Sequence, residues 1–452
     1  MPVFSKIIEK VVFLQIIEYL SENQLYHPNH HGFRSNHNTV TGIIQMYDIW
    51  TESLENKQMS GVMMVDLSAA FDMVDHSLLL EKLRIMGFGL ESCNFFQSYL
   101  NKRSQRVLID GHLSDELLIE CGVPQGSILG PLLYVLYTND LPEIVHTDCD
   151  MDNESYPRMH CNRCGNICSY ADDSTYTYCS ADPVEMSSKL TDVYNKISEY
   201  MVNNKLVINA EKTHLVVMGA RMSNDKRKLV KLNAGNCEIF PSSSEKLLGL
   251  TINENMKFHD HAVYGKNSLV KILSVKANAI LKISNHSTFK TRLMLANAFF
   301  NSNLIYMISV WGGTEKFVIR ILQVIQNRVA RYVTGHGLYT STKKLLLQCN
   351  WLSVKQLAVY NSLLQVYKII SSKEPKYLNQ KLSRHFPYNT RASANEGIRV
   401  AHEVRYNVTS QSFIIRAAKL WNMVPGKIRS ISEVSRFKAE LKLWVKDNVT
   451  LD

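Results

Sequence analysis

The sequence predicts an α+β chain in which a mixed helix-and-strand half precedes a basic, mostly helical half. Two apolar, strand-like runs carry acids at their ends, at Asp66 and at Asp172-Asp173, and Val123-Pro124-Gln125-Gly126 between them has the composition of a tight turn. Residues 261–452 hold 29 Lys+Arg against 8 Asp+Glu, a net charge of +21. The whole chain has 51 basic and 41 acidic residues. Residues 1–260 therefore hold 22 basic and 33 acidic residues, a net charge of −11. A protein with such a strongly basic half usually binds a polyanion through it.

Length and composition bound the class of protein. At about 150 residues per domain, 452 residues allow two to three domains. The 45% apolar and 20% charged residues are those of a globular protein. No apolar run reaches about 18 residues and no small-residue cleavage site follows the first helix, so we expect neither a membrane span nor a signal peptide. Nine cysteines, an odd number, favour a reducing intracellular compartment, the nucleus or the cytoplasm.

Hydrophobic spacing predicts the elements of the first half. Helices are expected over residues 1–31, 38–56, 77–86, 128–137 and 183–205, and strands over 61–67, 206–208, 215–218 and, as a short pair, 245–252. Asp75 is the expected N-cap of the helix at 77–86. Residues 107–109 and 117–121 are expected to pair as a hairpin around Asp110-Gly111.

The second half is predicted to be helical. Helices are expected over residues 268–283, 291–308, 319–333 and 353–370, and closing segments over 413–421 and 434–445. Residues 371–400 are richer in Pro, Ser and Asn, which is typical of a linker or an extended arm.

Two clusters hold side chains that could bind a metal. The turn at residues 27–31 is rich in histidine, but its neighbouring histidines point apart, so a solvated loop is the better interpretation. The second cluster leads into Asp172 and contains Cys149, Cys161, Cys164 and Cys168. Its spacing allows a small zinc knuckle, and free thiols in an inserted hairpin are the alternative.

The acids suggest a chemistry. Nucleotidyl transfer by two metal ions needs carboxylates that converge from separate strands. Asp66 and the Asp172-Asp173 pair meet this requirement if their strands are neighbours in one sheet. Gly126, which has no Cβ, would let the backbone approach a nucleotide or a template strand.

Three segments, in order, resemble motifs A, B and C of reverse transcriptases: Asp66–Asp72, Gly122–Pro131 and Tyr170–Asp173. The sequences of these motifs are similar to those in the polymerases of jockey-type non-LTR (LINE-like) retrotransposons. Further segments resemble the fingers motif, motif D, motif E and the region after the polymerase of this family: 32–34, 206–213, 247–249, 322–328, 351–354 and 418–422. The resemblance covers nearly the whole chain.

The resemblance implies a right-hand polymerase and assigns roles to individual residues. Asp66, Asp172 and Asp173 would be the catalytic acids and bind two Mg²⁺ ions, for which Mn²⁺ can substitute. The nucleotide-binding residues would be Arg34, Leu67, Phe71, Gln125, Gly126 and Lys212, and the primer grip would be Leu248 and Gly249.

Two of these roles have alternatives. Phe71 would be the steric gate that favours deoxynucleotides, or a core side chain beside the strand. Lys212 would be the general acid for the leaving pyrophosphate, or a solvated lysine.

The resemblance also implies domains and partners. Residues 1–60 would be partial fingers, 61–256 the palm with the Cys-rich insert at 146–168, 257–370 a helical basic thumb, and 371–452 a C-terminal extension. The expected partners are an RNA template, a DNA primer or target DNA, and dNTPs. The chain begins inside the family's first fingers motif and lacks the family's endonuclease, which a full-length element protein could supply.

The expected function is RNA-directed DNA synthesis. A catalytically inactive, nucleic-acid-binding remnant of a mobile element is the alternative. An RNA-templated RNA polymerase is a third interpretation, which Phe71 disfavours because it would exclude a ribose.

Overall fold

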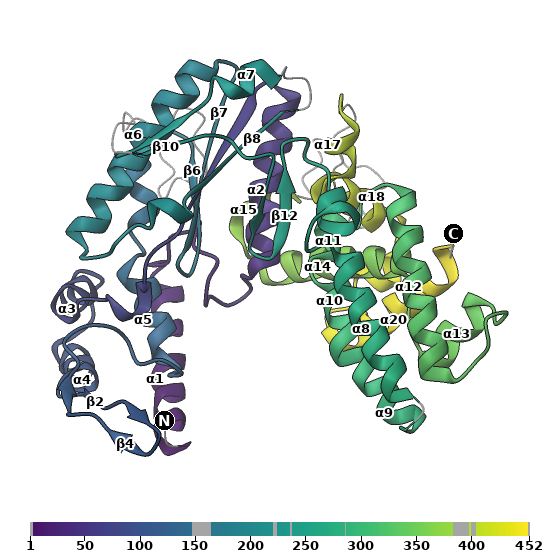
Figure 1. The fold of residues 1–452 in the computed structure, drawn as a ribbon, viewed down its shortest axis with the longest axis horizontal. Helices are drawn as coiled ribbons and strands as arrows, with labels where there is room; N and C mark the ends of the chain where they lie inside the picture. The colour runs from purple at the N-terminus through teal and green to yellow at the C-terminus, as the bar shows by residue number, and fades with distance from the viewer. Residues whose placement is uncertain are drawn as a thin grey trace. The chain divides into compact units, whose positions relative to one another are not determined.

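A computed structural model describes residues 3–146, 164–219, 224–235, 237–284, 286–382, 397–398 and 404–450 (Figure 1). The chain divides into two compact units. The first comprises Met1–Gly42, Ser60–Val217 and Met222–Ser242, and the second Ile43–Met59, Met218–Arg221 and Ser243–Asp452. The first unit holds a four-stranded sheet and the second is dominated by helices, as an α+β chain requires. The boundaries of the four predicted domains stay a prediction.

The core of the first unit is a sheet in the order β6-β7-β1-β8. Its strands are β1 (Met59–Val65), β6 (Asn166–Tyr170), β7 (Asp173–Ser180) and β8 (His214–Met218). All seven residues of β1 are buried, which explains its continuous apolar sequence. β6 and β7 form an antiparallel hairpin whose register pairs Tyr170 with Asp173, so Ala171-Asp172 is the turn.

The described part of the first unit holds six α-helices. They are α1 (Val3–Glu22), α3 (His76–Ile85), α4 (Leu90–Leu100), α5 (Leu129–Tyr137), α6 (Pro183–Asn203) and the short α7 (Asn224–Lys228). Two of them, α3 and α6, begin at an aspartate N-cap. The Asp75 side chain accepts a hydrogen bond from Leu78 N at 2.9 Å, so its prediction as N-cap of α3 is confirmed. Nearly every side chain of α5 is buried, and α6 packs against β7.

Short strands complete the unit and correct one prediction. They are β2 (Ser104–Gln105), β3 (Leu108–Ile109), β4 (His112–Leu113), β5 (Leu117–Leu118), β9 (Leu232–Ala234) and β10 (Cys237–Ile239). Asp110-Gly111 is a turn, as predicted, but β3 pairs with β4 while β5 pairs with β2. The expected pairing of 107–109 with 117–121 is wrong, because a two-residue turn places Ile109 directly opposite His112.

The histidine-rich turn is also corrected: it is buried, with His27 at 5% exposure and both His30 and His31 at 0%. The turn runs beside β6, where His31 N donates to Ser169 O at 2.8 Å and Ser169 N donates to Asn29 O at 3.0 Å. Pairing with the sheet edge removes these residues from water. Protein partners replace the water: the His30 ring contacts Thr138 O at 3.2 Å.

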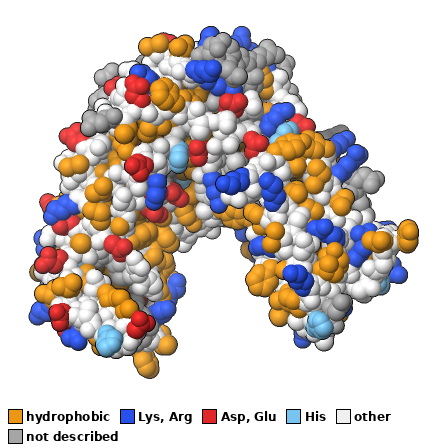
Figure 2. All heavy atoms as spheres, in the orientation of Figure 1, with side chains coloured by type: hydrophobic (Ala, Val, Ile, Leu, Met, Phe, Trp, Pro, Cys, Tyr) orange, Lys and Arg blue, Asp and Glu red, His pale blue; other side chains and the backbone are white. Residues whose placement is uncertain are grey.

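The second unit holds most of α2 (Thr39–Glu55), a hairpin of β11 (Ser244–Leu247) and β12 (Leu250–Asn253), and a group of helices that pack mainly against α12 and α14. Its helices are α8 (Leu269–Ser284), α9 (Phe289–Leu295), α10 (Ser302–Ile305), α11 (Ile308–Trp311), α12 (Lys316–Thr334), α13 (Thr342–Cys349), α14 (Val354–Ser372), α15 (Lys376–Lys381), α17 (Asn407–Gln411), α18 (Phe413–Met423), α19 (Gly426–Arg429) and α20 (Val434–Asn448). On the face in Figure 2, Lys and Arg outnumber acids over these helices. Within the described ranges, no helix has the length and apolarity to cross a bilayer.

Two predictions for the second unit need correction. The helix expected over 291–308 is interrupted: a π-helical turn at Ala296–Asn301 and a left-handed Met307 divide it into α9, α10 and α11. The expected linker at 371–400 contains α15, which is held by the second unit because Tyr377 donates to Asp48 at 2.7 Å. Residues 383–396 and 399–400 of that segment lie outside the described residues.

Candidate active site

The three predicted acids lie at the same end of two neighbouring strands. β1 and β7 are neighbours, and Ser60 near the start of β1 contacts Cys179 near the end of β7 at 3.5 Å. The strands are therefore antiparallel, which brings Asp66 after β1 to Asp173 at the start of β7. Burial, and then the negative charges of Asp172 and Asp66, raise the pKa of Asp173. Asp66 and Asp172 therefore lie close enough to act electrostatically on Asp173, and the two-metal role of the three acids stays a prediction.

Asp66 is held by the segment that resembles motif D. Its carbonyl accepts from Asn209 N at 2.9 Å, and Ser68 N donates to Val207 O at 2.9 Å. This bridge brings Lys212 Nζ to 3.6 Å from Asp66 Oδ2. It does not use the carbonyl of Leu67, the oxygen predicted to help bind metal.

The site fits hard cations, although the acids do not form a preassembled cluster. Asp66 Oδ2 is buried and, within the described part of the chain, accepts no hydrogen bond, although Lys212 Nζ lies 3.6 Å away. Carboxylate oxygens are the ligands that Mg²⁺ prefers. Among the described residues, no three His, Cys, Asp or Glu side chains are already grouped as a metal site. Like charges repel, so we expect these carboxylates to draw together only around a cation.

The zinc prediction concerns four cysteines, of which two are described. Cys149 and Cys161 lie outside the described residues. Cys164 is disulfide-bonded, and Cys168 is a thiol in β6 whose pKa is raised to about 12 by burial. Since zinc binds thiolates, these two positions do not support the zinc knuckle, which stays a prediction.

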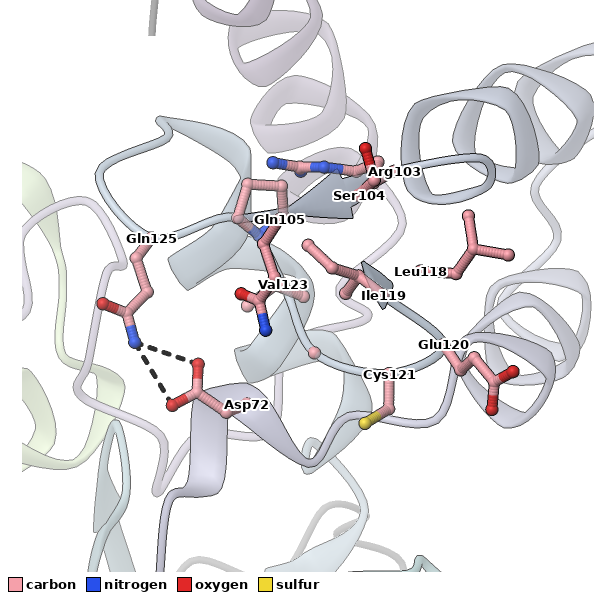
Figure 3. A pocket seen from close by; sticks show the side chains of 12 residues that line it. Asp72, Arg103, Ser104, Gln105, Leu118, Ile119, Glu120, Cys121, Val123 and Gln125 are labelled. Atoms are coloured by element: carbon pink, nitrogen blue, oxygen red, sulfur yellow. Dashed lines mark hydrogen bonds between the residues drawn. The ribbon is translucent and has the colours of Figure 1, made fainter. Parts of the chain in front are cut away.

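The motif B turn packs against the end of motif A. Val123 N donates to Phe71 O at 2.9 Å, and Gly122 N donates to Val74 O at 2.8 Å. A Cβ on Gly122 would lie 2.8 Å from Asp72 O, so only glycine allows this approach. Gln125 lies on the same turn, and its amide donates to both carboxylate oxygens of Asp72, at 2.9 and 3.2 Å (Figure 3).

The surroundings of Gly126 and Phe71 are compatible with their predicted roles, which stay predictions. Gly126 has a φ of +73° and a Cβ there would meet no atom within 4 Å, so its backbone faces open space. Phe71 is half-buried, and its ring centroid lies 4.6 Å from that of Tyr134. The ring therefore has one packed side and one accessible side, which is compatible with both predicted roles.

The described contacts of Arg34 and of Leu248 are with other residues of their own units. The Arg34 guanidinium lies 5.1 Å from the Tyr26 ring centroid and donates to His27 O at 3.0 Å. Leu248 and Gly249 form the turn between β11 and β12 in the second unit, where Tyr306 donates to Leu248 O at 2.7 Å. These assignments stay predictions.

Two residues of the site were not singled out from the sequence. Asp72, described above, holds Gln125. Glu9 of α1 is buried and accepts hydrogen bonds from Ile128 N and from Tyr99, so it caps the start of α5. Glu9 lies seven and eleven residues before the buried Ile16 and Leu20, and this helical spacing was the available signal.

The features described so far are those of a polymerase palm. They are a sheet with acids at the same end of two neighbouring strands, a lysine beside these acids, and a glycine turn packed against the end of motif A. Residues 1–252 match the family model described as reverse transcriptase (RNA-dependent DNA polymerase). This match covers more than half of the chain, and the chain belongs to this family. The predicted fold class is thereby confirmed.

Relatives carry the resemblance further. The chain is 25% identical over 339 residues to the probable RNA-directed DNA polymerase from transposon X-element of Drosophila melanogaster, covering 74% of this chain and 35% of that protein. It is 26% identical over 348 residues to the RNA-directed DNA polymerase from mobile element jockey of Drosophila funebris, covering 76% and 36%. The predicted resemblance to jockey-type elements is confirmed. The chain spans about a third of the length of these relatives.

The solved structures that the chain matches include telomerases. Telomerase from Candida Tropicalis in complex with a fragment of telomeric RNA matches with a TM-score of 0.42 and 12% identity, covering 100% of this chain and 57% of that one. The apo form matches with a TM-score of 0.41 and 10% identity, covering 82% and 60%. Similarity at this level adds nothing to the family assignment.

Proposed function

We propose that this chain is the RNA-directed DNA polymerase of a non-LTR retrotransposon. It would extend the 3′ hydroxyl of a DNA primer with deoxynucleotides along an RNA template. The observation that supports the proposal is the position of Asp66, Asp172 and Asp173. They lie at the same end of neighbouring strands β1 and β7 in a reverse transcriptase domain. The 3′ oxygen attacks the α-phosphorus of the dNTP, a phosphodiester forms, and pyrophosphate leaves.

The acids would hold two Mg²⁺ or Mn²⁺ ions, and the Leu67 carbonyl would add a further oxygen. When bound, the two ions activate the primer hydroxyl and stabilise the leaving pyrophosphate. The buried Asp66 Oδ2, which lacks a hydrogen-bond donor, supports this assignment.

Side chains of the chain itself would bind, orient and protonate. Lys212 would give a proton to the leaving pyrophosphate, and the 3.6 Å between its Nζ and Asp66 Oδ2 supports this role. Phe71 would exclude the ribose 2′ hydroxyl, and Gln125 and Gly126 would contact the nucleotide or the template. Arg34 would neutralise the triphosphate, and Leu248 with Gly249 would grip the primer.

The proposed partners are the RNA template, the DNA primer or target DNA, dNTPs and a full-length element protein that supplies an endonuclease. The +21 charge of residues 261–452 supports a nucleic-acid partner. The proposed location is the nucleus or the cytoplasm.

The test is primer extension on an RNA template with Mg²⁺ and dNTPs. The wild-type chain should extend the primer, and Asp172→Ala/Asp173→Ala should abolish extension while leaving the thermal melting temperature within a few degrees. Asp115→Ala, which removes an exposed acid from the same unit, is the control and should extend normally. Equal extension by wild type and the double variant would refute the mechanism. No extension by the wild type would favour an inactive remnant, and incorporation of ribonucleotides would favour the RNA polymerase.

A further inference from the structure

A groove of about 730 Å³ lies beside the motif B turn in the first unit (Figure 3). Its lining comprises Asp72, Arg103, Ser104, Gln105, Leu118, Ile119, Glu120, Cys121, Gly122, Val123, Pro124 and Gln125. The walls come from β2 and β5 on one side and from the end of motif A on the other. The groove has room for about one or two nucleotides on the scale of ordinary ligand sites.

One positive charge in this groove, that of Arg103, has no counter-ion among the residues that the structure describes. Among the described residues, nothing forms a hydrogen bond or an ion pair with the Arg103 guanidinium, whereas its neighbour Arg106 pairs with Glu116 at 3.0 Å. The two acids of the lining, Asp72 and Glu120, do not pair with Arg103. Asp72 accepts from Gln125, and Glu120 points to the opposite end of the groove from the Arg103 guanidinium in Figure 3.

The lining indicates the kind of ligand. It contains apolar side chains, among them Val123 and Pro124, but no aromatic ring on which a base could stack. Most of its side chains are exposed, so the groove is open and suits a chain that passes along it. A single guanidinium over an apolar floor, without stacking rings, matches the sugar-phosphate backbone of one polynucleotide strand.

We infer that this groove is a subsite for the unpaired template strand, in which Arg103 binds a backbone phosphate. The inference rests on the proposed function, since Gln125 at the rim of the groove is also the proposed contact to nucleotide or template. The hydrogen bond to Asp72 holds the Gln125 amide at that rim. The end of motif A therefore helps to form the groove, and the template strand would pass along this groove to the acids.

The experiment compares two neighbouring arginines. Arg103→Gln removes the unpaired charge, and Arg106→Gln removes a charge that Glu116 already neutralises. Binding is measured by fluorescence anisotropy, without dNTP, for an RNA–DNA duplex with a 5′ single-stranded RNA overhang and for the same duplex with blunt ends. Neither side chain is needed for folding, because β2 pairs with β5 through the backbone, and thermal melts of both variants verify this.

Arg103→Gln should weaken binding of the overhang duplex about fivefold, lower its salt slope by about one, and leave the blunt duplex unchanged. Arg106→Gln should stay within about twofold of wild type on both duplexes. A DNA overhang of equal length should show the same loss as the RNA overhang, because both strands carry the phosphate.

Three outcomes overturn the inference: equal losses for Arg103→Gln and Arg106→Gln, equal losses on overhang and blunt duplexes, or a loss confined to the RNA overhang. Primer extension by the wild type decides the proposed function separately. A wild type that extends primers but shows no effect of Arg103→Gln on overhang binding would leave the polymerase standing and remove the subsite.

Discussion

At the scale of single residues, Asp72 and Gln125 show how a site side chain is positioned. The two residues are far apart in sequence, and the Gln125 amide donates to both carboxylate oxygens of Asp72. Hydrogen bonds to a charged acceptor are stronger than neutral ones, although this pair is exposed to solvent. Asp72 should therefore act on the reaction only through Gln125.

This predicts that Asp72→Ala raises the KM for dNTP about fivefold with little change in kcat. Asp72→Asn, which keeps an acceptor oxygen, should recover most of the loss. On a Gln125→Ala background, Asp72→Ala should add nothing further. Steady-state primer extension measures all four variants. Additive losses, or a changed Mg²⁺ requirement in Asp72→Asn, would show that Asp72 acts on the metal site instead.

Two buried histidines predict how the first unit responds to acid. Burial lowers the pKa of His30 and of His37 to about 4, so both are neutral in the folded chain. Their contribution to the free energy of unfolding is complete above about pH 6.5 and is lost as the pH falls toward 4. Acidification from pH 7 to pH 5 should cost roughly 2 kcal/mol for each fully buried histidine.

Thermal melts at pH 7, 6 and 5 test this. His30→Gln, whose amide can still donate toward Thr138 O, should flatten the pH dependence. His112→Gln, at an exposed position in β4, should leave it as in the wild type. An unchanged slope in His30→Gln would mean that other groups set the acid sensitivity.

At the scale of elements, the turn between β6 and β7 depends on a glycine in a different segment. A Cβ on Gly32 would lie 2.5 Å from Ala171 N, inside any real contact distance. Ala171 already has a φ of +56° and its backbone cannot easily give way. The histidine-rich segment therefore braces the turn that presents Asp172 and Asp173.

Gly32→Ala should displace this turn, lower stability by about 1–3 kcal/mol and reduce primer extension at least tenfold. Gly89→Ala is the matched control, because a Cβ there meets nothing within 4 Å. Denaturant unfolding and primer extension on both variants measure the difference. Wild-type activity in Gly32→Ala would show that the turn tolerates movement.

At the scale of the whole molecule, the charge division predicts how nucleic acid binds. Residues 261–452 carry a net +21 and residues 1–260 a net −11. If the basic half follows the phosphate backbone, the observed affinity for an RNA–DNA duplex should fall linearly on a log–log plot against salt concentration, at about 0.7–0.9 per phosphate contacted. A titration series from low to physiological salt measures the slope. If the observed affinity did not change with salt concentration, the basic half would not bind the phosphate backbone.

Much of the fold could be predicted because helices and strands leave a local signature. Spacing of apolar residues located β1, α5, α6, α12 and α14, and the capping residue Asp75 marked the start of α3. Strand partners were harder to predict: the two-residue turn at Asp110-Gly111 pairs β3 with β4, and β5 pairs with β2 instead of β3. The π turn inside 291–308 is equally invisible to a search for regular periodicity.

The sequence by itself determined which acids lie at strand ends, the order of the three motifs and the basic character of the second half, because these are properties of neighbouring residues. Only the tertiary structure decided that Asp66 meets Asp173, that the histidines are buried beside β6, and that Asp72 holds Gln125. Each of these contacts joins residues far apart in the chain. Their geometry follows from strand order and packing, and no local pattern encodes it.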